Sequence, residues 1–368
     1  MPDKRSAAVA SRHLLRQRTR RAHAVLAGRG AAALQAALTV LDVRSRPVLI
    51  PANSCYIVLW AVLQRGCQPV LVDVDPLTAN VTPETLARCG VTQPAVIIPA
   101  HMYGLPAPMS AITAWARARG AFVIEDAALA LGTLADGKPA GAWGDASIFS
   151  FGQGKTADIG FGGALLTDDA RLATEIERAL ADMPLWSKAL QALNRQWLEI
   201  YWALHQFEDE NNRLAEVYPA LFDVYRQITR CRAADWRALA PALDRLDENL
   251  AHRHALAEFY DEQFAGLPVR SLSRPEDTSL WRYPLLVPTE QRNELLERLW
   301  ETGIFEATRW YPSLQPMLRA LAPGSPATPT PATDALAKQI VNLPLAPETT
   351  REHAREILRV IVEYFEAL

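Results

Sequence analysis

Short apolar runs alternate with segments of helical periodicity from about residue 30 to residue 170, and this alternation limits the possible folds more than any other feature. The expected strands are the apolar runs at 48–50, 69–72, 95–98, 122–124, 147–149 and 163–166. Helical spacing of apolar residues occurs between them, at 57–64, 83–88 and 109–119. Strands joined through helices form a largely parallel sheet with helices on both faces. The first half of the chain is therefore predicted to be a large α/β domain.

Two of the expected strands lead directly into residues that can carry chemistry. Asp126 follows the strand at 122–124, and Lys155 follows the strand at 147–149 after a short glycine-containing segment. Sites in such folds lie at the carboxyl ends of the strands. Pyridoxal phosphate chemistry needs an acid that keeps the pyridine nitrogen protonated and an amine that forms a Schiff base. Asp126 and Lys155 suit these roles; the alternatives are a capping or ion-pairing aspartate and a solvated surface lysine.

Composition and charge exclude several classes of protein. The chain has 368 residues, of which 49% are apolar and 21% charged, with a formal net charge of −3, so neither nucleic acid nor an anionic membrane is an expected partner. The four cysteines are dispersed and form no CxxC pair, which predicts no metal site, no disulfide framework and a reducing, cytoplasmic location. The Arg-rich first thirty residues lack the apolar stretch of a signal peptide. The sequence contains no run of 18 apolar residues, so no membrane span is predicted.

Two phosphate-binding motifs are incomplete. The sequence at 154–156 reads Gly-Lys-Thr, but Phe149 stands where a P-loop needs its first glycine, which argues against a nucleotide hydrolase. The Gly-x-Gly-x-x-Ala pattern at 28–33 resembles a dinucleotide fingerprint, but the next strand ends at 50–53 without an acidic residue, so a nicotinamide enzyme is not expected. Small residues that open a helix can still hold a phosphate through free N–H groups. The alternative is a turn that only permits close packing.

The second half of the chain predicts an aromatic-rich helical excursion and then a smaller domain. The excursion covers about 185–230 and is expected to pack on the main domain or on a partner subunit. From about residue 245 the order is helix, strand, strand and helix, and 351–368 is a closing helix; 323–331 is a proline-rich loop. The predicted division is a large domain at 1–240 and a small α+β domain at 241–368.

Six motifs occur in an order and at a spacing that resemble the DegT/DnrJ/EryC1/StrS family of pyridoxal-phosphate-dependent sugar aminotransferases. The similarity runs from about residue 24 to the end of the chain, and the C-terminal Asn342-Leu343-Pro344-Leu345 also fits. The motifs are Pro51-Ala52-Asn53-Ser54, Val72-Asp73-Val74-Asp75-Pro76, His101-Met102-Tyr103-Gly104-Leu105-Pro106, Glu125-Asp126-Ala127-Ala128, Phe149-Ser150-Phe151-x-x-x-Lys155 and Gly162-Gly163-Ala164-Leu165-Leu166-Thr167.

The resemblance implies a fold type I transferase that binds pyridoxal 5′-phosphate. Lys155 would be the Schiff-base lysine and the base for proton transfer, and Asp126 would contact the pyridinium nitrogen. The phosphate would lie among Ser150, Gly30 and Ala31. The resemblance also places Cys55, Tyr56 and Leu129 at the cofactor ring. It places His101 and Tyr103 close to the ring face or to the substrate.

The segment that begins at Arg309 and Trp310 looks like a substrate-side loop, because arginine can meet a phosphate and tryptophan can stack on a base or sugar. The alternative for this pair is a packing corner of the small domain, and His101 and Tyr103 could equally be structural residues of a turn.

Several positions depart from the pattern of the family. Ala31 stands where relatives often have a phosphate-binding threonine, and Leu129 stands where many have glutamine or histidine. Cys55 replaces an aromatic residue that often stacks on the ring. The segment that reaches a neighbouring subunit's cofactor in relatives aligns with 228–231, which reads Ile-Thr-Arg-Cys. These departures bear on substrate handling more than on cofactor binding, since backbone donors remain.

The function that the resemblance implies is transfer of an amino group from an amino acid, with glutamate as the expected donor, to a keto group of a nucleotide-linked sugar or a similar polyhydroxylated ketone. Two alternatives share the fold. A sugar dehydratase would have histidine in place of Lys155, and a non-catalytic regulatory or scaffold protein would keep the cofactor without turnover. A homodimer is expected, because relatives build the site at a subunit interface.

Overall fold

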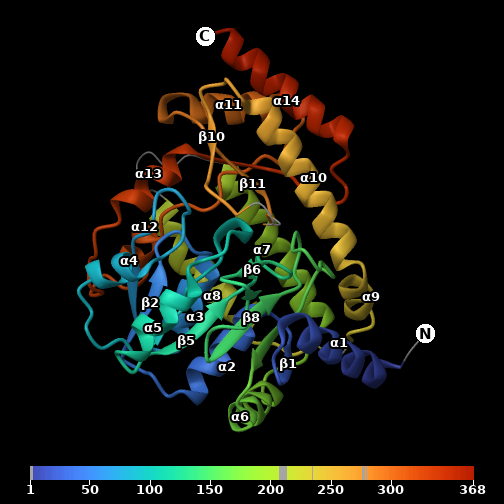
Figure 1. Cartoon of the computed structure of the whole chain (residues 1–368). Helices are drawn as coiled ribbons and strands as arrows, with labels where there is room; N and C mark the ends of the chain where they lie inside the picture. The colour runs from blue at the N-terminus through green and yellow to red at the C-terminus, as the bar shows by residue number, and fades with distance from the viewer. Residues whose placement is uncertain (1–2, 207–213, 234, 276–277, 279) are drawn as a thin grey trace.

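A seven-stranded sheet forms the centre of the molecule in the computed structural model, which describes residues 3–206, 214–233, 235–275, 278 and 280–368 (Figure 1). The strands lie in the order β1-β9-β8-β5-β4-β2-β3. Their bounds in that order are His23–Ala27, Gly163–Thr167, Ala146–Ser150, Phe122–Asp126, Val96–Ile97, Pro47–Pro51 and Gln68–Val72. All six strands expected from the apolar runs are present, and β1 adds a seventh at the edge.

The sheet is mixed and mostly parallel, as predicted. β2 pairs in parallel with β3 and β4, β4 with β5, and β5 with β8, whereas β9 runs antiparallel to both β8 and β1. The register aligns Asp126 with Ile148, so β5 and β8 end side by side. The residues that follow these two strands therefore emerge at the same edge of the sheet.

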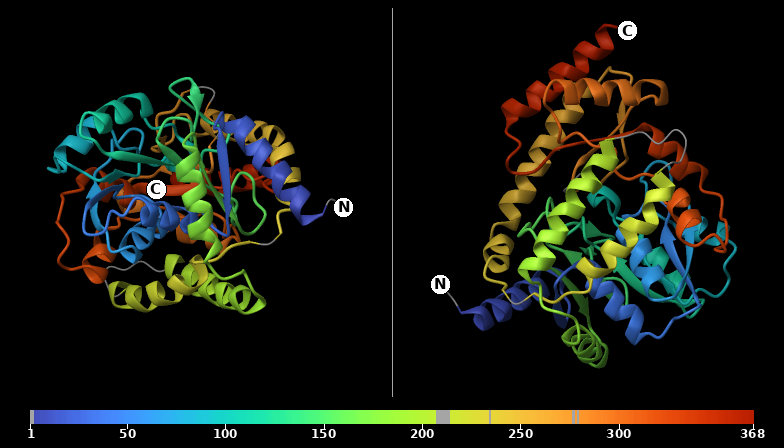
Figure 2. Two further views of the ribbon diagram at one scale, coloured as in Figure 1. Left: turned by 90° about the horizontal axis from the view of Figure 1, so that it is seen from below. Right: turned by 180° about the vertical axis from the view of Figure 1, so that it is seen from behind.

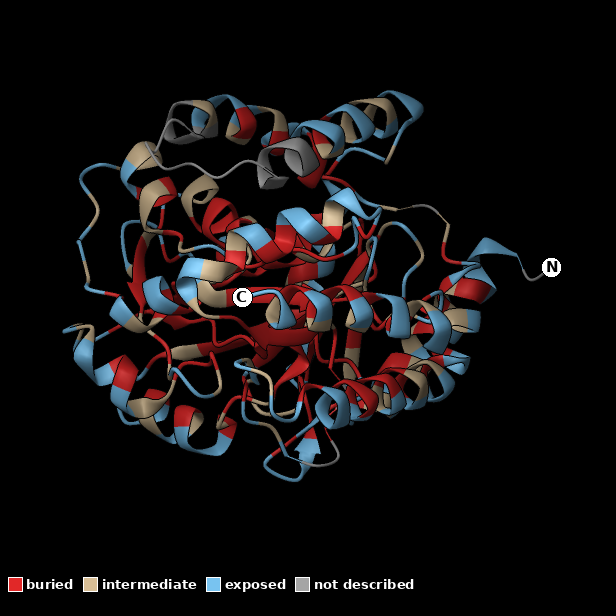
Figure 3. Cartoon of the chain, turned by 90° about the horizontal axis from the view of Figure 1, so that it is seen from above, coloured by how far each residue is buried: buried red, intermediate tan, exposed pale blue. Residues whose placement is uncertain are grey.

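Helices cover both faces of the sheet, and their packing follows from side-chain size. One face carries α2 (Gly30–Val40), α3 (Tyr56–Gln64) and α6 (Ala170–Ala181), and the other carries α4 (Pro83–Arg88) and α5 (Met109–Arg117). In α2 every residue from Ala31 to Leu38 is buried, because its alanines allow close contact with α3, α6 and β9. Figure 3 shows this buried sheet between helices whose outer faces are exposed.

The predicted helical excursion consists of two helices, α7 (Lys188–Gln206) and α8 (Leu214–Thr229). Residues 207–213 of the predicted excursion lie outside the described residues. The two helices contact each other and form an outer layer on the face of the sheet that carries α3 (Figure 2). An aromatic cluster joins this layer to α3, where Trp60 lies 6.2 Å from Trp197 and 4.7 Å from Tyr225 between ring centroids.

The C-terminal part begins with α9 (Leu239–Asp244) and the long helix α10 (Leu246–Phe264), which runs from the large domain to the far end of the molecule (Figure 1). Its small antiparallel sheet has the order β10-β11-β12, with bounds Arg270–Ser271, Tyr283–Leu286 and Ile340–Leu343. The helices here are α11 (Thr289–Glu301), α12 (Gln315–Leu321), α13 (Pro331–Gln339) and α14 (Arg351–Glu366). The predicted boundary between residues 240 and 241 falls inside α9.

Besides β1, several elements were absent from the sequence-based expectation. Among them β12, α12 and α13 lie near or within the proline-rich part of the chain, and they are short. Another, α1 (Lys4–Thr19), is the Arg-rich N-terminal segment, whose helix begins at Asp3 through side-chain bonds to the backbone N–H groups of Arg5 and Ser6. None of the helices in the described part of the chain combines the length and the apolar character that a membrane span requires.

Candidate active site

The sheet brings Asp126 and Lys155 to one place. Asp126 is the last residue of β5, and Lys155 lies in the loop that follows the neighbouring strand β8. Both side chains are half-buried. The two groups lie close enough for the charge of each to stabilise the charge of the other. The juxtaposition expected from the two strand ends is thus present in the fold.

Burial shifts the pKa values of these two groups toward their neutral forms. It raises the pKa of Asp126, an effect only partly offset by the N–H group of Ala128 and by the charge of Lys155. It lowers the pKa of Lys155 from the ordinary value, against the opposing influence of the carboxylates of Asp126 and Asp158. The site therefore combines an amine that loses its proton more easily than an exposed lysine with a carboxylate that lacks a full counter-charge.

The start of α2 lies against the end of β8. Gly30 is the first residue of α2, and a Cβ atom there would lie 3.1 Å from the carbonyl oxygen of Phe149 and 3.5 Å from Cβ of Ser150. A side chain at position 30 would therefore be crowded against the backbone of β8. No side chain caps this helix start. Its first N–H groups, the buried Ala31 and the Ser150 hydroxyl form the kind of helix terminus that binds phosphate.

This arrangement fits pyridoxal phosphate at both ends of the cofactor. The α2 terminus and Ser150 offer donors for the phosphate, and a protonated pyridine nitrogen would supply the cation that Asp126 lacks. Asp126 accepts the Ala128 N–H at 3.0 Å, and no cationic side chain in the described part of the chain lies within ion-pair distance of it. Lys155 would hold the aldehyde carbon between these two points.

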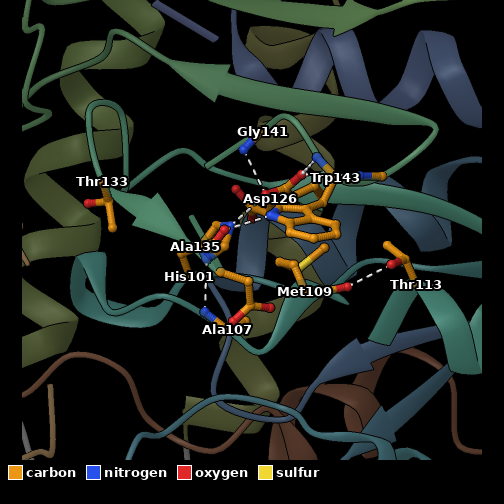
Figure 4. A network of polar contacts seen from close by, with 12 residues as sticks. His101, Ala107, Met109, Thr113, Asp126, Thr133, Ala135, Gly141 and Trp143 are labelled. Carbon is orange, nitrogen blue, oxygen red and sulfur yellow. Dashed lines mark hydrogen bonds and ion pairs between the residues drawn. The ribbon is translucent and has the colours of Figure 1, made fainter. Parts of the chain in front are cut away.

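A neighbouring carboxylate, Glu125, organises the loop beside the site. Figure 4 shows three of the residues that contact it, His101, Gly141 and Trp143. The Glu125 side chain is fully buried and accepts the N–H groups of Gly141, Trp143 and Gly144 at 2.6, 2.9 and 3.2 Å. His101 Nε2 lies 2.8 Å from Glu125 Oε1. Burial by itself would raise the pKa of Glu125, but the bond to His101 and these N–H groups outweigh it and hold the pKa below its ordinary value.

His101 has no ring nitrogen left for a substrate. Its Nδ1 atom accepts the N–H of Ala107 at 3.0 Å, which places the ring proton on Nε2, where it is donated to Glu125. The ring is 1% exposed. Of the two roles open for His101, these contacts favour the structural one.

The three residues expected around the cofactor ring have different surroundings. Cys55 is half-buried at the start of α3, and burial raises the pKa of its thiol to about 11, with Lys155 acting in the opposite direction. The ring of Tyr56 packs against Trp60 at 4.7 Å and Trp197 at 6.0 Å. Leu129 is 7% exposed and belongs to the core on the α5 face of the sheet. The electrostatic effect of Lys155 and Asp126 on its thiol links Cys55 to the site.

The residues expected near the substrate belong to an aromatic wall beside the lysine loop. Tyr103 is buried, and its hydroxyl accepts the N–H of Tyr311 at 3.1 Å. Trp310 is 9% exposed and stacks on Trp281 with 5.6 Å between ring centroids. Arg309 is half-buried. The Trp281 ring in turn faces the amine of Lys155 at 5.5 Å, so the loop at 309–311 does reach the neighbourhood of the site.

Sequence reasoning missed the residues that contact the lysine loop from the C-terminal half. Trp281 and Asn249 donate hydrogen bonds to this loop, and a pocket of about 470 Å³ opens beside them. The walls of the pocket include Lys155, Asn249, His252 and Arg253. No local signal marks Trp281 and Asn249, since their partners in the loop are about a hundred positions away in the chain. The described residues contain no group of three or more His, Cys, Asp or Glu side chains that could hold a metal ion.

Comparison with known proteins agrees with this geometry. The model of the DegT/DnrJ/EryC1/StrS aminotransferase family matches residues 13–362. A dTDP-3-amino-3,4,6-trideoxy-alpha-D-glucose transaminase of Streptomyces venezuelae is 31% identical over 94% of this chain and 83% of its own length. A pleiotropic regulatory protein of Geobacillus stearothermophilus is 28% identical over 94% of this chain and 86% of its own.

A solved structure shows the same fold. The crystal structure of DesV from S. venezuelae superposes with a TM-score of 0.78 at 25% identity, over 98% of this chain and 89% of the other. Family, fold and the paired Asp126 and Lys155 lead to one conclusion: the chain belongs to the DegT/DnrJ/EryC1/StrS aminotransferase family and is a pyridoxal-phosphate-dependent enzyme.

Proposed function

We propose that this enzyme transfers an amino group from glutamate to a keto group of a nucleotide-linked sugar. The observation that carries the proposal is the meeting of Lys155 and Asp126 at the carboxyl ends of two adjacent parallel strands. The sugar is inferred from the family and from the transaminase of S. venezuelae, which is named for an aminated dTDP-sugar. The active unit is proposed to be a homodimer.

When bound, pyridoxal phosphate supplies an electron sink for the charge that develops on a carbon when its proton is removed. The chain would hold it with Asp126 at the ring nitrogen, with Lys155 at the aldehyde, and with Ser150, Gly30 and Ala31 at the phosphate. The lowered pKa of Lys155 leaves its Nζ neutral more readily, so that it can take a proton from the α-carbon of the donor. The same Nζ would return a proton to the carbon that receives the amine.

The surroundings of Asp126 support its part in this chemistry. Its raised pKa is a consequence of burial without a full counter-charge. A protonated ring nitrogen would relieve that cost, and the resulting ion pair would lower the pKa of Asp126. Cys55, with its pKa raised to about 11, stays a neutral thiol at neutral pH, so it adds no negative charge next to Lys155.

The test is the visible absorption spectrum of the purified protein with pyridoxal phosphate, before and after glutamate is added. We expect a band from cofactor bound through lysine, which glutamate bleaches. Lys155→Ala should abolish the band, and Lys338→Ala, which removes an exposed lysine on α13, should leave it unchanged. A band that persists in Lys155→Ala would contradict the assignment of the lysine.

The same experiment separates the alternative roles. A lysine-dependent band that neither glutamate nor any other amino donor bleaches would favour a regulatory protein, the role for which the relative from G. stearothermophilus is named. Bleaching by glutamate followed by recovery with a nucleotide-linked keto sugar would support the proposed transfer. Lys155 itself speaks against a dehydratase, because in that branch histidine takes the place of the lysine.

A further inference from the structure

The loop that carries Lys155 is closed by its own polar groups. The carboxylate of Asp158 accepts the N–H groups of Gly154 and Gly160, each at 2.6 Å. Lys155 N–H donates to the carbonyl of Gly152 at 3.2 Å, and Ile159 N–H donates to that of Phe151 at 3.0 Å. These bonds give the loop its shape, but they do not fix its position relative to the rest of the site.

Two side chains from the C-terminal half bind the backbone carbonyls on either side of Lys155. Trp281 Nε1 donates to the carbonyl of Gly154 at 2.7 Å, and Asn249 Nδ2 donates to the carbonyl of Thr156 at 2.7 Å. Trp281 lies in the segment before β11, and Asn249 lies in the first turns of α10. The carbonyl groups of the residues before and after Lys155 are thus attached to two different elements.

A buried arginine joins these two attachments. Arg253, 2% exposed and one turn after Asn249 on α10, donates from Nε to Asn249 Oδ1 at 2.7 Å and from Nη1 to the carbonyl of Trp281. Burial lowers the pKa of Arg253 to about 10, which still leaves it charged at neutral pH. In the described part of the chain no carboxylate lies within ion-pair distance of it, although burying an unpaired charge is costly. An apolar residue would fill the space without that cost, so packing alone does not account for a guanidinium here.

Three further contacts fix the position of Trp281. Its backbone N–H donates to the carbonyl of Tyr103 at 2.7 Å, its ring stacks on Trp310, and its carbonyl accepts a hydrogen bond from Arg253. The face of this ring lies 5.5 Å from the amine of Lys155. The wall that touches the lysine side chain is therefore part of the same assembly that holds the lysine backbone.

We propose that Asn249, Arg253 and Trp281 form a positioning bracket that fixes the Lys155 amine for proton transfer. This inference rests on the proposed function of Lys155. Its physical reason is that a lysine has four rotatable side-chain bonds, and proton transfer tolerates little displacement: a misplacement of about 1 Å can cost about a hundredfold in rate. In the described part of the chain, Arg253 forms no hydrogen bond with the loop or with Lys155, so it acts through the other two residues.

The first test uses the protein without added cofactor. Trp281→Phe keeps an aromatic ring but removes the donor to Gly154, and Trp300→Phe is the matched control, because Trp300 Nε1 donates to the carbonyl of Ala307 at 2.9 Å away from the loop. Hydrogen exchange measured by mass spectrometry should rise about fivefold to tenfold in the peptide covering 152–160 in Trp281→Phe only. Equal exchange in both variants would overturn the proposal.

Arg253→Lys tests the bracket rather than a single bond. A lysine keeps the charge but cannot bridge Asn249 and Trp281 with the same fork of donors. We expect increased exchange at 152–160 although no direct bond to that loop is removed. If Trp281→Phe increases exchange at 152–160 and Arg253→Lys does not, the arginine is not part of the positioning bracket, and the proposal is wrong. Asn249→Ala serves as a further variant should either protein fail to fold.

The second test separates positioning from general structure. With cofactor and glutamate, Trp281→Phe and Arg253→Lys should lower kcat about tenfold or more while KM for glutamate changes little, because a misplaced amine affects proton transfer and not donor binding. Trp300→Phe should match the unaltered enzyme. A parallel rise in KM with unchanged kcat would contradict the proposal. The unaltered protein shows whether the proposed function itself fails. In that case it would give no lysine-dependent absorption band, whatever hydrogen exchange the variants show.

Discussion

Two carboxylates adjacent in the chain, Glu125 and Asp126, have opposite electrostatic surroundings. Successive side chains of a strand point to opposite faces, so one carboxylate meets three backbone N–H groups and His101 while its neighbour faces the site. The pKa of Glu125 is consequently lowered, and burial raises that of Asp126. The first holds a loop, and the second is the carboxylate for which we propose a cationic partner in the cofactor.

Glu125→Gln should destabilise the fold by about 3 kcal/mol at neutral pH, because the amide N–H₂ group would face N–H donors in a buried place. Since the folded-state pKa of Glu125 lies below its ordinary value of 4.5, its stabilisation is complete above that pH and is lost as the pH falls through the folded-state pKa. The difference in free energy of unfolding between the two proteins should therefore narrow in acid. Urea titrations at several pH values measure it.

Glu297→Gln, an exposed substitution on α11, is the control and should change the free energy of unfolding by less than about 0.5 kcal/mol. A difference for Glu125→Gln that stays constant down to the lowest pH would mean that its charge is not what holds the loop at 141–144.

At the scale of elements, the helix ends decide where functional groups lie. α2 begins without a side-chain cap against β8, which leaves N–H groups for a ligand. α14 instead begins with a structural cap, where the Thr350 hydroxyl accepts the N–H of His353 at 3.1 Å. Its apolar stripe of Ala354, Ile357, Val360 and Ile361 is buried on the small domain. In both helices the first N–H groups lack backbone partners within the helix. A side chain caps those of α14, whereas those of α2 are left for a ligand.

Thr350→Ala should lower the free energy of unfolding by about 1 kcal/mol, because the N–H of His353 loses its partner. Thr350→Ser retains the hydroxyl and should cost clearly less. Chemical denaturation of the three proteins checks this, and a serine variant as unstable as the alanine variant would show that the methyl group, and not the cap, matters.

At the scale of the whole molecule, one hydrophobic core connects the large sheet with the small domain. It includes Leu49 and Val123 of the large sheet, Tyr260 of α10, Leu285 of the small sheet and Ile357 of α14. This shared core keeps Trp281 and Asn249 in register with the lysine loop, although they belong to the C-terminal half. The site is consequently a product of both halves of the chain.

The predicted excursion leaves apolar side chains exposed: Leu185, which precedes α7, is 46% exposed, and Ile200 of α7 is 50% exposed. A homodimer should form in solution, and sedimentation should give twice the 40.7 kDa of one chain. If this layer contributes to the contact, Ile200→Asp should shift the protein toward the monomer at low concentration, because it places a charge in an apolar interface. Val9→Asp, at an apolar position of α1 that is 60% exposed, is the control. A fully active monomer would contradict the dimer.

Amino-acid order alone determined the sheet, the two strand ends and the pair Asp126 and Lys155. These follow from local patterns: apolar runs of strand length, helical spacing between them, and chemical groups placed directly after strands. Six strands and most helices of the large domain were predictable for this reason. β12 and α13 were not, because short elements in a proline-rich region have weak periodicity, and their pairing partners are distant in the chain.

Only the tertiary structure decided how Lys155 is held. Asn249 and Trp281 are 94 and 126 positions from the lysine, and nothing in their local sequence indicates a contact with its loop. The structure also brought His101 to Glu125, where sequence alone left its role open, and it packed the ring of Tyr56 against Trp60. Strand position is a local property of the chain, whereas the partner of a buried polar group depends on which distant segments the common core brings together.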